Sequence, residues 1–241
     1  MKRYKLYSIV LLMMFSISLV SANENQPRGI DLEEYAFGIP ANQLGFNRYS
    51  RFTLSFWANV KEFNHSEYGT HFVNIRNVSQ GWPMSDWGYM WSQIGKSDYN
   101  YDNFEKKIEM SIKNAADVPI ISEELSPFEF NESEWKFFSF VFDYGQYRSL
   151  TLYIDGIATY AIDVVHTDYY WKSSYILMIG GKACYRSPLN AHIDKVQFYK
   201  KALSQEEVIE SMTSPLLNDE SLLGYWDLDR KSTRLNSSHS P

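Results

Sequence analysis

The stretch WKFFSFVFDYGQYRSLTLYIDGIATYAIDV, residues 135–164, decides the fold class. Residues 135–143 are apolar on both sides of an extended chain, which is typical of a central strand covered on both faces. Residues 149–164 form two runs rich in aromatic and β-branched side chains, joined at Asp155 and Gly156. Asp-Gly between two such runs is the strongest short-range signal for a β-hairpin. The stretch therefore predicts a central strand followed by a hairpin.

The segments on either side extend this pattern. In RFTLSFWANV, residues 51–60, apolar and mostly polar side chains alternate. The apolar face holds Phe52, Leu54, Phe56, Ala58 and Val60, and the other face holds Thr53, Ser55, Trp57 and Asn59. Alternation with a period of two marks a strand with one buried face. Further strands are expected within residues 30–39, 175–181 and 191–199, so the chain is predicted to be all-β.

One helix is expected, in LSQEEVIESM, residues 203–212. Ser204 stands in the N-cap position and Glu207 follows three residues later, which is the pattern of a capping box. Leu203, Val208 and Met212 would attach this short C-terminal helix to the sheets.

Both ends of the chain have a composition that sets them apart from a folded domain. Residues 1–22 combine a basic start, an apolar core and small residues before a cleavage site, as in a secretory signal peptide. We therefore expect a secreted, periplasmic or cell-surface protein with no membrane span after cleavage. Residues 229–239, DRKSTRLNSSH, resemble a translated sequencing-adapter oligonucleotide, so 229–241 are interpreted as a disordered artefact. Residues 23–228 are left as one domain.

Composition excludes some classes of function. The formal net charge is −6 with no basic run, which disfavours nucleic acid as a partner, because neutralising phosphates requires a basic face. Cys184 is the single cysteine, so an intramolecular disulfide is impossible. Aromatic residues make up 17% of the chain, more than a core of this size needs, which favours an aromatic recognition surface.

The order of the segments carries a family resemblance. FTLSFWANV (52–60), SEWKFFSFVFDYGQYRSLTLYIDGIA (133–158), LMIGG (177–181) and AHIDKVQFYKKALSQEEV (191–208) follow one another along the chain. This ordered set resembles a laminin-G-like domain of the concanavalin A-like superfamily over residues 52–212. The resemblance implies a two-sheet antiparallel jelly-roll sandwich. LLGYWDL, residues 222–228, is also similar to family sequence, either as the closing strand of this domain or as the start of a second one.

The implied fold hosts lectins, adhesion modules, polysaccharide hydrolases and spacers, so the site has to decide the function. Hydrolases of this superfamily carry their two carboxylates as Glu-x-Asp-x-Glu or Glu-x-Asp-x-x-Glu, and neither string occurs here. The nearest candidates for a glycan hydrolase are Glu132 and Glu134, in a segment whose Asn, Glu and Ser residues are typical of a turn. Binding is therefore expected rather than catalysis.

A structural calcium ion is the one cofactor that the resemblance implies. In the wider superfamily, the Asp of an IDxVxxY strand contributes a calcium ligand, and Asp194 occupies that position. The alternative is that Asp194 binds backbone groups at the sheet edge.

Two segments rich in aromatic and small polar residues, 77–104 and 166–175, are expected to be long loops and carry the main functional hypothesis. Aromatic rings cover the C–H faces of sugars while neighbouring polar groups bind the hydroxyls. We expect a glycan site formed by Trp57, Trp82, Asp86, Trp87, Tyr89, Trp91, Tyr170 and Trp171. A cell-surface protein is the alternative partner, because protein interfaces are also enriched in Tyr and Trp.

Overall fold

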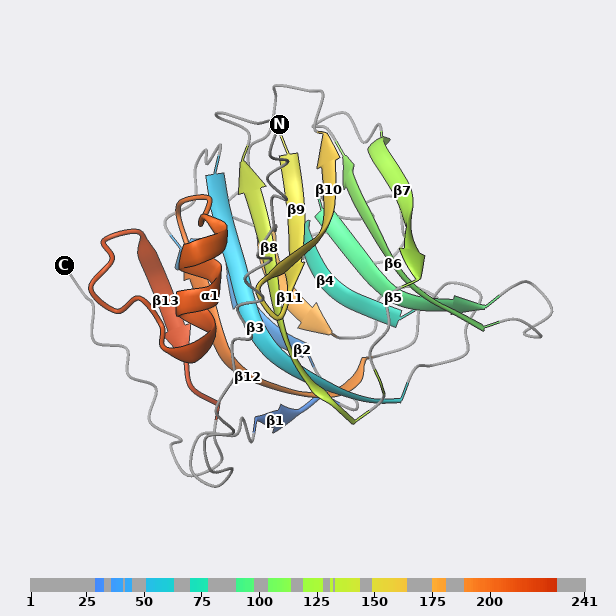
Figure 1. The fold of residues 1–241 in the computed structure, drawn as a ribbon, viewed down its shortest axis with the longest axis horizontal. Coiled ribbons are helices and arrows are strands. Elements are labelled where there is room, and N and C mark those ends of the chain that lie inside the picture. The colour runs from blue at the N-terminus through green and yellow to red at the C-terminus, as the bar shows by residue number, and fades with distance from the viewer. Residues whose placement is uncertain are drawn as a thin grey trace, which may run out of the picture.

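A computed structural model shows two antiparallel sheets packed face to face, with one helix on the outside (Figure 1). It describes residues 29–32, 36–40, 42–44, 51–62, 70–77, 90–97, 104–113, 119–127, 131, 133–143, 149–163, 175–180 and 189–228. The predicted all-β sandwich with a short C-terminal helix is confirmed. Residues 1–22 and 229–241, assigned above to a signal peptide and an artefact, lie outside the described residues.

The first sheet has seven strands and contains the stretch that decides the fold. Its order is β1 (Ile30–Asp31), β12 (Asn190–Tyr199), β3 (Arg51–Glu62), β8 (Trp135–Asp143), β9 (Ser149–Ile154) and β10 (Ile157–Asp163). β13 (Leu222–Trp226) pairs antiparallel with β12 on the edge that also binds β1. In this structure residues 222–226 are therefore an edge strand of the same sandwich.

The second sheet has six strands. Its order is β2 (Ala36–Pro40), β11 (Tyr175–Gly180), β4 (Thr70–Asn77), β5 (Met90–Ser97), β6 (Phe104–Lys113) and β7 (Pro119–Pro127). The expectation of one long loop over residues 77–104 is wrong, because β5 lies within it and pairs with β4 and β6. This part of the segment is held by its neighbours, although its own sequence has no clear period of two.

The hairpin predicted at Asp155 and Gly156 is confirmed. β9 and β10 pair antiparallel, and the two turn residues have φ angles of 51° and 77°. Positive φ at both central positions is the geometry of a type I′ turn, whose twist matches that of the strands. β8 is buried from Phe137 to Asp143, which confirms the central strand covered on both faces.

Aromatic residues fill the space between the two sheets. Phe72 of β4 contacts Phe56 of β3 and Phe138 of β8, with ring centroids 5.4 and 4.7 Å apart and edge-to-face angles of 65° and 80°. All three rings are fully buried. Burying such a side chain contributes about 1.5–3 kcal/mol, so these rings account for much of the attraction between the sheets.

A second, smaller core lies on the outer face of the seven-stranded sheet. The helix α1 (Gln205–Thr213) covers this face, and the core consists of Phe137, Val141, Tyr199, Leu203 and Val208. For this reason Thr53 and Ser55 of β3 are fully buried, and the expectation that β3 has only one buried face is wrong. The Thr53 hydroxyl is satisfied, since it donates to the Lys201 carbonyl and accepts from the Leu203 N–H at 2.9 and 3.0 Å.

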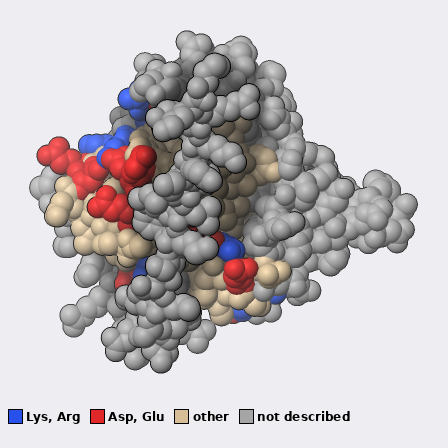
Figure 2. Space-filling model, in the orientation of Figure 1, with Lys and Arg blue, Asp and Glu red and all other residues tan. Residues whose placement is uncertain are grey.

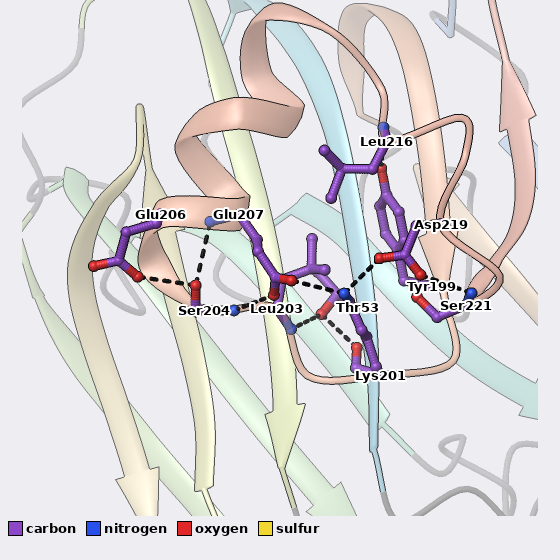
Figure 3. A network of polar contacts seen from close by, with 10 residues as sticks. All are labelled: Thr53, Tyr199, Lys201, Leu203, Ser204, Glu206, Glu207, Leu216, Asp219 and Ser221. Atoms are coloured by element: carbon purple, nitrogen blue, oxygen red, sulfur yellow. Dashed lines mark hydrogen bonds and ion pairs between the residues drawn. The ribbon is translucent and has the colours of Figure 1, made fainter.

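The predicted capping box begins α1. The Glu207 N–H donates to the Ser204 hydroxyl at 3.3 Å, and the Glu207 carboxylate accepts from the Ser204 N–H at 2.9 Å. Lys201 donates to Glu207 at 2.7 Å and also to Asp219 in the segment after the helix (Figure 3). The Lys201 hydrogen bond and that from Ser221 lower the pKa of Asp219 to about 2. Lys201 therefore joins both ends of the helical segment to the sheet.

Within the described part of the chain, α1 is far too short and too polar to cross a membrane.

Candidate functional site

The described residues test only part of the predicted aromatic site. Trp57 lies in β3 of the seven-stranded sheet, and Trp91 lies in β5 of the six-stranded sheet, where its strand partners are Asn74 and Ser111. The remaining predicted residues, Trp82, Asp86, Trp87, Tyr89, Tyr170 and Trp171, lie outside the described residues. They stay predictions, and the flanking strands show where their segments are attached.

The two aromatic segments are attached at one end of the six-stranded sheet. Residues 78–89 connect the last residue of β4, Asn77, to the first residue of β5, Met90. Residues 164–174 lead into the first residue of β11, Tyr175. Tyr175 pairs with Asn77, and Met90 pairs with Ile75, so these strand ends lie side by side on β11, β4 and β5. The topology therefore brings the attachment points of both segments to the same end of the six-stranded sheet.

Trp57 has structural contacts under α1. Its ring packs against Phe137 with centroids 5.4 Å apart, and its indole N–H lies 3.4 Å from the carbonyl oxygen of Met212. The side chain is half-buried within the outer core. These contacts attach the end of α1 to β3, on the sheet opposite to the one that carries Trp91.

Asp194 is buried and binds backbone groups. Its Oδ1 atom accepts from the N–H of Lys195 at 2.7 Å and from that of Leu228 at 2.9 Å. Calcium prefers six to eight oxygen ligands, and the described residues contain no group of three or more His, Cys, Asp or Glu side chains placed to hold a metal. The contacts of Asp194 thus fit the backbone-binding alternative, and the calcium ion stays a prediction.

A row of polar and aromatic residues that the sequence analysis did not single out crosses four strands of the seven-stranded sheet. Asp31 of β1 pairs with His192 of β12, which pairs with Asn59 of β3, which in turn pairs with Trp135 of β8. Residues opposite one another on paired strands share a face. The neighbouring core residues Ala58, Ala191 and Ile193 point inward, so this row is on the outer face. Each of its four members is half-buried.

Contacts among these residues, with Lys61 beside them, fix the geometry of the row. The Lys61 ammonium forms an ion pair with the Oδ2 atom of Asp31, and the Nε2 atom of His192 lies 3.6 Å from the same oxygen. The rings of His192 and Trp135 are within 26° of parallel, with centroids 6.4 Å apart. The Asn59 amide donates to the Ser133 carbonyl at 2.9 Å. These five residues lie on four strands that are far apart in the sequence, so no single sequence motif revealed them.

Gly29 lets the chain pass close to this row. Its φ angle is +47°, and a Cβ atom there would lie 2.2 Å from the Ile193 carbonyl oxygen and 3.1 Å from the Cη2 atom of Trp135. Only glycine tolerates both the backbone angle and the close approach. Gly29, directly before β1, therefore lies close to the tip of the indole.

The candidate hydrolase carboxylates are only partly described. Glu132 lies outside the described residues. Glu134 forms an ion pair with Lys136 at 2.9 Å, and Lys136 also pairs with Asp155 at 3.0 Å. The Lys136 hydrogen bond, helped by the Asn131 N–H, lowers the pKa of Glu134, whereas a general acid in glycoside hydrolysis needs a raised pKa. Glu134 thus stabilises the turn before β8.

The described surface around α1 is acidic. Figure 2 shows Asp and Glu side chains gathered where Figure 1 places α1 and β13. Glu206 and Glu207 lie in the first turn of the helix. Negative charge near a helix N-terminus is stabilising, so part of this acidity has a structural cause.

Comparisons with solved structures show the same fold. An inferred carbohydrate-binding protein from Bacteroides ovatus is 14% identical, with a TM-score of 0.57, over 85% of this chain and 52% of its own. The NanB sialidase of Streptococcus pneumoniae is 15% identical, with a TM-score of 0.54, over 75% of this chain and 27% of its own. A Trypanosoma rangeli sialidase is 14% identical, with a TM-score of 0.52, over 79% of this chain and 28% of its own. The chain therefore spans about half of the Bacteroides protein and less than a third of either sialidase.

No sequence among the curated proteins matches this chain. A family model does match, over residues 36–209, which is most of the chain. This match agrees with the ordered strand and helix segments and with the observed sandwich. The protein therefore belongs to the Laminin_G_3 family, the concanavalin A-like lectin/glucanases superfamily.

Proposed function

We propose that this domain is a secreted carbohydrate-binding module whose site lies at the end of the six-stranded sheet. The observation that carries the proposal is the pairing of Tyr175 with Asn77 and of Met90 with Ile75. These pairs bring together the strand ends from which residues 78–89 and 164–174 extend. Both segments are rich in aromatic residues. A joint site requires that they start from neighbouring strand ends, as these do.

The residue types suit saccharides. Trp82, Trp87, Tyr89 and Trp91 belong to or follow the first segment, and Tyr170 and Trp171 belong to the second. Aromatic rings would cover the apolar C–H faces of sugar rings, while Asp86 would accept hydrogen bonds from hydroxyl groups. Trp57 is left out of this site, because it is engaged under α1 on the other sheet.

The similar structures support the same class of ligand. The Bacteroides ovatus protein is described as carbohydrate-binding, and the Trypanosoma rangeli sialidase was solved with 2,3-difluorosialic acid. Because identities near 14% show the fold alone, the argument rests on the site. The basic, apolar and small-residue pattern of residues 1–22 supports export to the periplasm, the cell surface or the medium.

A glycan microarray tests the proposal with the purified protein. We expect a defined set of saccharides to bind, and Trp87→Ala and Trp171→Ala to weaken binding about tenfold, equivalent to ~1.4 kcal/mol each. Asn218→Ala, at an exposed position in the segment after α1, is the control and should bind as the wild type does. A silent array together with capture of a cell-surface protein would instead establish the protein-binding alternative.

A further inference from the structure

The outer face of the seven-stranded sheet is covered unevenly. The row that contains Trp57 and Phe137 lies beneath α1 and belongs to the second core. The next row on this face is two residues further along β3. It contains four half-buried residues, Asp31, His192, Asn59 and Trp135. The cover provided by α1 thus ends one row away from a set of side chains that retains contact with solvent.

Two rings flank an amide in this row. Asn59 on β3 lies between His192 on β12 and Trp135 on β8, and the two ring planes are within 26° of parallel. An indole next to hydrogen-bonding groups provides an apolar face and polar partners at once, which is the combination that binds a sugar ring. The positions are held by paired strands, so a ligand would bind with little ordering of the protein.

The charges at the end of the row indicate the ligand class. Asp31 and Lys61 form an ion pair, so the carboxylate and the ammonium neutralise each other. An anionic sugar would gain no net attraction there. Hydroxyl groups can both donate to Asp31 and accept from Lys61, and the His192 imidazole offers a further donor or acceptor. The set therefore suits an uncharged saccharide.

We propose that Asp31, Asn59, Lys61, Trp135 and His192 form a second saccharide site, which takes an uncharged pyranose. This site rests on the proposed function, because it assumes that the domain handles carbohydrate. It lies on the seven-stranded sheet, whereas the two aromatic segments extend from strand ends of the six-stranded sheet. One molecule would then contact a long or branched glycan at two separate places.

Titration calorimetry with the full chain tests the second site. Xylohexaose, cellohexaose and mannohexaose serve as uncharged probes, and hexagalacturonate serves as the acidic probe. We expect an uncharged probe to bind, and His192→Ala and Lys61→Ala each to raise its Kd by roughly tenfold. Trp135→Phe should have a similar effect, and the other two variants carry the test if it fails to fold. Lys200→Ala, which follows β12 at an exposed position, is the matched control.

Each outcome separates the two proposals. If Trp87→Ala abolishes binding while His192→Ala and Lys61→Ala stay within about twofold of the wild type, the second site is wrong and the first stands. If only the second group of variants loses affinity, the second site stands and the location of the first is wrong. Tighter binding of hexagalacturonate overturns the proposed ligand class. Absence of binding to all four probes overturns the second site, and absence of binding on the microarray as well overturns both.

Discussion

Lys201 and Asp219 form an ion pair that connects the segment after β12 with the segment between α1 and β13 (Figure 3). The same ammonium also binds Glu207 in the first turn of α1. Burial disfavours the charged form of Lys201, yet its two carboxylate partners raise its pKa overall. One cation thus stabilises the position of the helix on the sheet.

Replacing Lys201 by Met is expected to lower the free energy of unfolding by about 1–3 kcal/mol, because two partly buried carboxylates would lose their shared partner. Chemical denaturation monitored by circular dichroism measures this change. Lys200→Met, at the adjacent exposed position, should change stability by less than about 0.5 kcal/mol. Equal losses from the two variants would show that the ion pairs contribute nothing.

Acid should weaken the same connection. The pKa of Asp219 is lowered to about 2 by hydrogen bonds from Lys201 and Ser221. A group whose pKa is depressed in the folded state stabilises that state above its unfolded pKa and loses the contribution as pH falls. The stabilising effect is therefore complete above about pH 4 and disappears as the pH approaches about 2. Melting temperatures of the wild type and Asp219→Asn should converge over this interval, and a constant difference would contradict the assignment.

Asp194→Ala is expected to destabilise the protein by about 2–3 kcal/mol, because it removes the acceptor of two backbone N–H groups, those of Lys195 and Leu228. Thermal melts with calcium and with a chelator test the predicted metal at the same time. A calcium ion present at a hundredfold its Kd would add about 2.7 kcal/mol that the chelator removes. A drop in melting temperature with the chelator would establish the ion, and equal melting temperatures in both solutions would leave the two hydrogen bonds as the role of Asp194.

Gly156→Ala should disrupt the contact between the β9–β10 turn and α1. The φ angle of Gly156 is +77°, and an added Cβ would lie 2.6 Å from the Cγ1 atom of Ile209. The left-handed backbone costs an alanine about 1–2 kcal/mol before the steric clash is counted. The double variant Gly156→Ala with Ile209→Ala should recover only the part of the stability loss that the steric clash causes. A single variant as stable as the wild type would contradict this geometry.

Local patterns predicted the features that depend on neighbouring residues in the chain. The turn at Asp155 and the cap at Ser204 are set by short-range hydrogen bonds and backbone angles, and both were predicted correctly. The burial of Ser55 was missed, because it depends on a helix about 150 residues later in the sequence. β5 was missed for a related reason, since its pairing with β4 and β6, rather than its own periodicity, makes it a strand.

The candidate site was likewise predicted only where it depends on local sequence. Composition identified aromatic segments, but their common attachment edge depends on which strands pair, such as β11 with β4. The row from Asp31 to Trp135 combines four strands that are distant in sequence. The position of Asn59 on the polar face of its strand was the one signal available beforehand.

The shared edge of β12 has a consequence for how the domain can be connected to other proteins. Trp226 of β13 pairs with Val196 of β12, and the N–H of Leu228 donates to Asp194. On the same side of β12, Ile30 at the start of β1 pairs with Ile193. The last and first described segments thus meet end to end along one strand. A circular permutant that links residue 228 to residue 29 through a short Gly-Ser bridge should fold, and the domain could be inserted into a host loop without stretching it.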